Sequence, residues 1–188
     1  ELPGALPRRE MKDAPRRADP ATVAGDQHRD FELYRISNKT TVLLGAEQRL
    51  ELGAFYSYKH LFHPIFQVLD QNSNDYGLYS RFVSDSRMFG NRNQFVLGLN
   101  LLQGEVDDDR FRNVAGAAGT RTGEAAQRSK NVTLFAENQH YVLPSTAVIV
   151  GAQAVHSGRR LSDRFPGDGD SSVDRTYRRL TPKVGIRQ

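Results

Sequence analysis

Apolar and polar residues alternate along most of the chain after residue 30. The clearest example is residues 93–103, where the apolar side of an extended chain would carry Phe95, Leu97, Leu99 and Leu101. The opposite side would carry Gln94, Gly98 and Asn100. A period of two predicts a β-strand with one apolar and one polar face.

The same alternation predicts six further strands, over residues 33–44, 50–60, 76–84, 131–143, 147–156 and 177–188. These segments are longer than the roughly 5–6 residues usual in globular proteins. They match the ~9–11 residues that a tilted strand needs to cross a bilayer. The pattern therefore favours an all-β chain, an antiparallel transmembrane β-barrel segment of about seven strands, over a soluble antiparallel sandwich, which stays the alternative.

The alternation also predicts which side chains face lipid. The expected lipid-facing residues are Leu50, Leu52, Ala54, Tyr56 and Tyr58 in one strand and Val148, Val150, Ala152 and Ala154 in another. The expected lumen-facing residues are Glu51, Gly53, Ser57, Lys59, Gly151 and Gln153. The opposite register would place Lys59 against hydrocarbon, which costs ~2–4 kcal/mol at the bilayer midplane. Aromatic residues near strand ends are candidates for interfacial girdles: Tyr56, Tyr58, Tyr76, Phe89, Tyr141 and Tyr177.

The connections between the predicted strands alternate in length. Residues 45–49, 85–92 and 144–146 form short ones, and residues 60–75, 104–130 and 157–176 form long polar ones. Membrane barrels have short periplasmic turns and long extracellular loops. We therefore expect residues 1–30 to be an extracellular-type loop, with at most a short helix in residues 7–14, and residues 31–188 to be barrel strands and loops.

The amino-acid composition narrows the possible classes of protein further. Hydrophobic residues make up 38% of the chain and the mean hydropathy is −0.60, so a soluble core would be thin. The absence of cysteine excludes disulfides, thiolate metal sites and cysteine nucleophiles. The net charge is +4, but 22 acidic residues are interspersed with 26 basic ones, so no nucleic-acid partner is expected. The chain begins at Glu1 without an initiator Met or a signal-peptide pattern, so we expect any signal peptide to have been removed or to lie upstream, and the chain to be a fragment.

Four short motifs, in order, resemble the barrel of TonB-dependent outer-membrane receptors. They are residues 91–100 (NRNQFVLGLN), 134–139 (LFAENQ), 150–153 (VGAQ) and 182–186 (PKVGI), and the likeness covers about residues 28–188. Phe135 stands where that family often has tyrosine. The family's plug domain, its TonB box and the rest of the barrel have no counterpart here.

The resemblance implies part of a larger barrel in a Gram-negative-type outer membrane. It implies outer-membrane lipid around the chain, import of a scarce solute such as a ferric siderophore, and energy from the TonB complex through the plug. The alternatives are a passive porin-like channel and, less favoured, an outer-membrane hydrolase or a soluble β-sandwich binding domain.

The residues suggest no catalytic, cofactor or metal site, and no enzyme. His60 and His63 could share a metal only if the backbone turned helically. The acidic residues Glu105, Asp107, Asp108 and Asp109 lack the spacing of a calcium loop. The candidates for ligand contact are Arg110, Arg112 and Arg121, because a cationic mouth attracts an anionic chelate.

Overall fold

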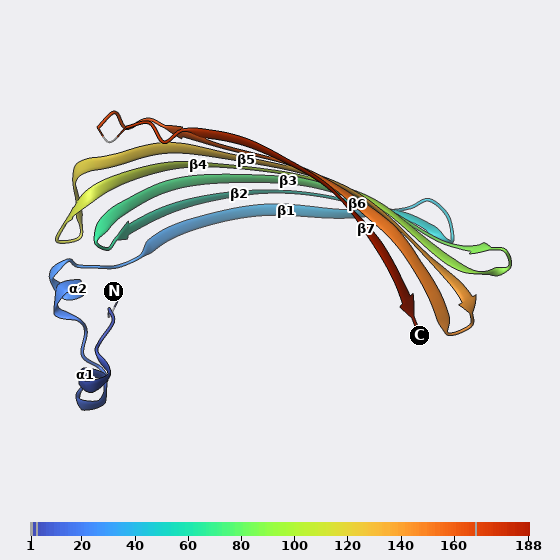
Figure 1. The fold of residues 1–188 in the computed structure, drawn as a ribbon, viewed down its shortest axis with the longest axis horizontal. Helices are drawn as coiled ribbons and strands as arrows, with labels where there is room; N and C mark the ends of the chain where they lie inside the picture. The colour runs from blue at the N-terminus through green and yellow to red at the C-terminus, as the bar shows by residue number, and fades with distance from the viewer. Residues whose placement is uncertain (1, 3, 168) are drawn as a thin grey trace.

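Seven antiparallel strands form one sheet in a computed structural model, which describes residue 2, residues 4–167 and residues 169–188. The strands are β1 (Asp30–Leu43), β2 (Gln48–Pro64), β3 (Gln67–Met88), β4 (Asn91–Val114), β5 (Ala117–Leu143), β6 (Thr146–Asp163) and β7 (Val173–Arg187). Each pairs with its neighbours in chain order, and Figure 1 shows them side by side in one curved sheet. β1 and β7 are the two edges, so these residues make an open sheet. The seven predicted strands and the all-β class are confirmed.

The strands extend well beyond the lengths that the alternation predicts. β3, β4 and β5 contain 22, 24 and 27 residues, and only residues 65–66 and 115–116 separate β2 from β3 and β4 from β5. The prediction of long loops over residues 60–75 and 104–130 is therefore wrong. The third long connection is shorter than expected and covers residues 164–172.

Pairing with the neighbouring strand explains these extensions. Residues 70–75 contain no alternating apolar residue, yet their backbone continues the ladder with β4, for example through Asn72↔Asp107 and Gln71↔Asp108. A strand that is wetted on both faces needs no apolar side, so its sequence carries no period-two signal. Backbone hydrogen bonds across the hairpin hold it extended.

The strand register sorts the side chains onto two faces. The outer face comprises the even-numbered positions of β1, β2, β3, β6 and β7, those of β5 from Glu124 on, and the odd-numbered positions of β4. The inner face comprises the alternate positions. One hydrogen-bonded row on the outer face contains Thr40, Leu52, Ser80, Leu99, Leu134, Ala154 and Leu180. The predicted apolar sides of the strands thus share one face.

The apolar band of the outer face runs obliquely across the sheet. Toward the end where β1 begins, it stops at Tyr34, Tyr58, Tyr76, Leu101, Val132, Ala154 and Leu180 on the successive strands. Leu180 lies in the row of Thr40, six positions beyond Tyr34 on β1. At about 3.3 Å per residue and about 4.8 Å per strand, this offset corresponds to a strand tilt of about 35° relative to the band. Strands of membrane barrels tilt by ~35–45°.

Two short helices precede the sheet, α1 (Arg8–Asp13) and α2 (Pro20–Ala24). α1 confirms the short helix expected in residues 7–14. α2 was not predicted, although Asp19 caps it, accepting a hydrogen bond from the backbone N–H of Thr22, and Pro20 occupies its first turn. No helix of the described residues is long and apolar enough to cross a membrane.

The N-terminal segment is fastened to one end of the sheet, as Figure 1 shows. The side-chain amide of Asn113 donates hydrogen bonds to the carbonyl of Gly25 at 2.9 Å and to that of Ile65 at 2.6 Å. The backbone N–H of His28 donates to the carbonyl of Pro64 at 3.2 Å. The segment therefore contacts the turns that join β2 to β3 and β4 to β5.

Candidate functional site: the inner face of the sheet

The inner face is polar and carries an excess of positive charge. Its basic residues are Arg35, Lys39, Arg49, Lys59, Arg81, Arg87, Arg92, Arg110, Arg112, Arg159, Arg175, Arg179, Lys183 and Arg187. Its acidic residues are Glu51, Asp75, Asp85, Asp108, Glu137 and Asp163. A wall with more basic than acidic side chains attracts anions and repels cations.

Glu51 is the centre of an ionic cluster on β1, β2 and β3. Its carboxylate lies 3.8 Å from Lys39 Nζ, 3.3 Å from Arg49 Nε and 3.8 Å from Arg81 Nη1. The side chain of Glu51 is only 14% exposed, so its charge depends on these partners. Arg49 Nη1 also lies 3.1 Å from Asp85, which extends the cluster toward the turn before β4.

A polar recess of about 560 Å³ lies farther along the sheet, on β5, β6 and β7. Its inner-face lining includes Phe135, Glu137, Gln153, Thr181 and Lys183. Lys183 Nζ donates to Glu137 Oε2 at 2.6 Å. The recess combines one ion pair, an amide and a hydroxyl, groups that can bind a polar solute.

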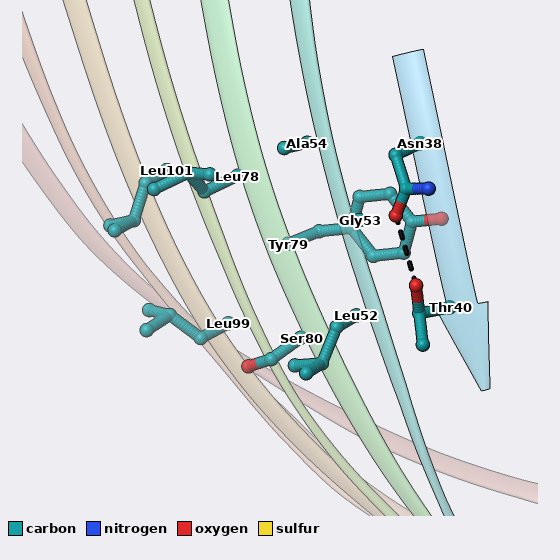
Figure 2. Close-up of a pocket in the computed structure, with 10 residues that line it drawn as sticks. All are labelled: Asn38, Thr40, Leu52, Gly53, Ala54, Leu78, Tyr79, Ser80, Leu99 and Leu101. Carbon is teal, nitrogen blue, oxygen red and sulfur yellow. Dashed lines mark hydrogen bonds between the residues drawn. The ribbon is translucent and has the colours of Figure 1, made fainter. Parts of the chain in front are cut away.

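Aromatic rings lie over glycines on the inner face. Figure 2 shows the ring of Tyr79 across Gly53, and a Cβ at Gly53 would come within 2.0 Å of that ring. A Cβ at Gly98 would come within 2.1 Å of Phe135. Each ring comes from the residue directly opposite on the neighbouring strand. Only glycine allows the rings to lie this close to the sheet.

The outer face, in contrast, is apolar and carries a hollow of about 460 Å³. Figure 2 shows that its lining includes Leu52, Leu78, Leu99 and Leu101, with the small side chain of Ala54 at one side. Near the β1 edge, Thr40 Oγ1 donates to Asn38 Oδ1 at 2.9 Å, so these two polar groups satisfy each other.

The structure separates the three predicted ligand-contact arginines. Arg110 and Arg112 are on the inner face of β4, and Arg110 donates to the buried carboxylate of Asp108 at 2.8 and 3.0 Å. Arg121 pairs with Glu124 and lies 3.6 Å from Asp109, both on the outer face. Contact of these arginines with a ligand stays a prediction.

The two histidines considered for a metal lie on opposite faces of β2. His60 Nε2 is 2.9 Å from Asp70 Oδ1, and His63 Nδ1 is 2.6 Å from the carbonyl oxygen of His28. The strand conformation rules out the helical turn that would have brought the two imidazoles together. No group of three or more potential metal-ligating side chains is found in the described ranges.

The structure places only part of the predicted girdle residues on the outer face. Tyr56, Tyr58 and Tyr76 are on the outer face at the edge of the apolar band, and Tyr34 joins them. The hydroxyls of Tyr56 and Tyr58 donate to Asn74 and Asn72 at 2.8 and 2.9 Å. Tyr141 and Tyr177 are on the inner face, and Phe89 is in the turn between β3 and β4. The girdle interpretation was wrong for Tyr141 and Tyr177 because both occupy odd-numbered positions of their strands.

These features define the class of fold. Long tilted antiparallel strands, an apolar band with tyrosines at its edge and a charged opposite face are the architecture of an outer-membrane β-barrel wall.

Comparisons with known proteins identify the particular fold. The chain is similar to the ferric citrate transporter FecA in its unliganded form, with a TM-score of 0.82 and 9% identity over 99% of this chain and 29% of FecA. It is also similar to the open form of the ferric-catecholate import receptor Fiu from E. coli K12, with a TM-score of 0.61 and 7% identity over 85% of this chain and 32% of Fiu. The chain thus has the fold of a segment of a TonB-dependent receptor barrel. It spans less than a third of the length of these two structures.

No family model matches the chain, and no curated protein matches it. Proteins can share this fold at sequence identities of only 7–9%, because the fold requires few particular residues. Alternation, tilt and pairing define a barrel wall, and many different apolar and polar residues satisfy them.

Proposed function

We propose that this chain forms part of the wall of an outer-membrane receptor that imports an anionic metal chelate, such as a ferric siderophore. The observation that carries the proposal is the basic inner face, opposite an apolar band tilted as in a membrane barrel. The two similar structures are named for ferric citrate transport and ferric-catecholate import. The rest of the barrel, a plug and energy from TonB belong to the same proposal.

The charge balance suits a chelate with carboxylate or catecholate groups. Arginine binds such groups through two parallel N–H···O bonds, and its charge persists at any physiological pH. On β7 the inner face carries Arg175, Arg179, Lys183 and Arg187 without an acidic residue of that strand among them. A wall with this charge raises the concentration of an anionic solute inside the lumen.

Uptake by the full-length product of the gene tests the proposal. Cells that produce it should accumulate ferric citrate or a ferric catecholate, and an uncoupler of the inner membrane should abolish this import. Uptake that persists with the uncoupler would instead support a passive porin-like channel.

Substitution on the inner face tests the role of charge. Arg179→Gln should reduce uptake of the anionic chelate several-fold, because one cation is lost from the wall. The matched control is Arg179→Lys, which keeps the charge and should keep uptake. Equal uptake by all three proteins would contradict a role of this cation.

A further inference from the structure

The regular ladder between β1 and β2 ends next to a proline. Its first pair is Asp30↔Phe62, and the backbone N–H of His28 donates to the carbonyl of Pro64 at 3.2 Å, one step beyond that pair. A hydrogen-bonded antiparallel pair exchanges two N–H···O bonds, and the second bond here would come from the N–H of residue 64. Proline has no N–H. The carbonyl of His28 therefore lacks the backbone donor that an ordinary residue at position 64 would give.

The side chain of His63 supplies the missing donor. Its Nδ1 donates to the carbonyl of His28 at 2.6 Å, so an imidazole replaces a backbone N–H at this point. We call residues 25–29, which lead from α2 to the start of β1, the strap. The bond from His63 keeps the strap in line with β2 beyond the regular ladder.

Asn113 holds the strap from the neighbouring hairpin. Its amide nitrogen donates to the carbonyl of Gly25 at 2.9 Å and to that of Ile65 at 2.6 Å. Its Oδ1 accepts a hydrogen bond from the backbone N–H of Gly116 at 2.8 Å, which fixes the direction of the amide. A Cβ at Gly116 would come within 3.0 Å of the Cβ of Asp26, so the strap lies directly against the β4–β5 turn.

The strap is attached by far fewer contacts than the strand that follows it. All 14 residues of β1 pair with β2 along the backbone. Among the described residues, the strap forms a single backbone hydrogen bond to the sheet, and its other hydrogen bonds to the sheet come from the side chains of His63 and Asn113. Each such bond contributes little net free energy because water competes for the same groups. The strap can therefore open locally while the sheet stays folded.

We infer that the strap is a releasable latch, held closed by two side chains, His63 and Asn113, in place of a backbone ladder. When the latch is closed, the N-terminal segment lies against the β2–β3 and β4–β5 turns, as in Figure 1. When it opens, the chain pivots at the start of β1 and the segment leaves both turns. In the proposed receptor this end is extracellular, so the latch sets how the segment lies at the mouth. Only that consequence rests on the proposed function.

Amide exchange of His28 in the purified full-length protein measures the latch. Its N–H is bonded to Pro64 only while the strap is closed, so its protection factor reports the closed fraction. His63→Ala should lower this protection roughly fivefold, as expected for the loss of one hydrogen bond. Asn113→Ala should lower it at least as much. Mass spectrometry of peptides that contain residue 28 measures both, and unchanged protection in the two variants would overturn the inference.

Two control variants remove similar hydrogen bonds that do not touch the strap. His60→Ala removes an imidazole bond of 2.9 Å to Asp70 on the same strand as His63. Asn93→Ala removes the paired amide bonds of 2.9 and 3.0 Å to Asn138 at the other end of β4. Both should leave the protection of residue 28 unchanged. A loss in the controls equal to that in His63→Ala would show general loosening of the sheet and refute a latch.

A double-mutant cycle tests whether His63 replaces the donor that proline lacks. Pro64→Ala gives β2 a backbone N–H that can donate to the carbonyl of His28. In that background, His63→Ala should change the protection less than about twofold, against roughly fivefold when the proline is present. The cycle compares two effects of the same substitution, so the packing lost with the buried proline ring cancels. Equal effects in the two backgrounds would refute the replacement of the donor.

Trypsin cleavage gives an independent measure of opening. Arg29 lies in the strap, and Arg17 lies outside it, between α1 and α2. Cleavage after Arg29 requires the open strap, so it should be several-fold faster in Asn113→Ala than in the parent protein, while cleavage after Arg17 should be equally fast in both. Equal rates after Arg29 would overturn the inference. Solute import enters none of these measurements, so failure of the latch and failure of the proposed function are distinguishable.

Discussion

The two faces of this sheet are built from adjacent residues of the same strands, and they differ in almost every physical property. On β4, Leu99 belongs to the apolar band and Asn100, the next residue, belongs to the polar inner face. The outer face carries aliphatic side chains that no packed layer of the described residues covers, and in the proposed barrel lipid covers them. The inner face depends on ion pairs such as those of Glu51 and on aromatic rings that cover glycines.

The described residues of this wall lack the packed hydrophobic core that a soluble protein has. The buried hydrophobic residues are only Leu61, Val68, Val83, Val96 and Ala147 among the described residues, whereas large apolar side chains of the outer band are exposed. In the proposed barrel, the bilayer stabilises one side of the wall and polar pairing stabilises the other. Four predictions test this difference, in order of decreasing effect.

The largest effect is expected when a charge enters the apolar band. Leu99→Arg should destabilise the full-length receptor by about 2–4 kcal/mol, because the guanidinium would face hydrocarbon near the midplane. Asn100→Arg places the same group on the inner face and should change stability little. Urea unfolding from lipid vesicles measures both, and equal losses would contradict the assignment of the faces.

A methyl group on the inner face should have the next largest effect. Gly98→Ala should cost about 1–3 kcal/mol, because its Cβ would overlap the ring of Phe135 and force it off the sheet. Gly158→Ala, at an open position, serves as the control and should cost far less. In a Gly98→Ala, Phe135→Leu double variant, part of the loss should be recovered, and an additive loss would argue against this contact.

Loss of one carboxylate from the ionic cluster should have a smaller effect. Glu51→Gln should destabilise the receptor by about 1 kcal/mol, because Lys39, Arg49 and Arg81 would then repel one another while remaining partly solvated. The control is Glu32→Gln, on the exposed outer rim. Thermal unfolding at low and high salt would measure the difference, which salt should reduce.

The smallest effect is expected in the loop between β6 and β7. Hydrogen bonds from the Ser171 hydroxyl and from the backbone N–H groups of Phe165 and Ser171 lower the pKa of the Asp163 carboxyl. A folded-state pKa below the unfolded value stabilises the loop at neutral pH, and this contribution is lost as the pH falls through the folded pKa. The protection factor of the Ser171 amide, which is the intrinsic exchange rate divided by the observed one, should therefore fall on acidification. Asp163→Asn should exchange fast at neutral pH, and identical pH profiles would contradict the role of this carboxylate.

The sequence by itself determined the part of the fold in which apolar and polar residues alternate. Where one face meets hydrocarbon and the other meets water, the side chains must alternate, so seven strands and their facing could be predicted from residues such as Leu97, Gly98 and Leu99. The order of short motifs also indicated the receptor-barrel fold. α2 also has a readable sequence signal, since Asp19 is a helix-capping residue and Pro20 favours the first turn.

Only the tertiary structure decided what lies outside the hydrocarbon and between the strands. Residues 70–75 are polar on both faces, so backbone pairing with β4 keeps them extended where the sequence suggested a loop. The inner cluster joins Lys39, Glu51 and Arg81 from three strands, and the polar recess beside Lys183 joins the three strands β5, β6 and β7. Their positions depend on inter-strand register, which hairpin geometry and pairing set and which no single strand encodes.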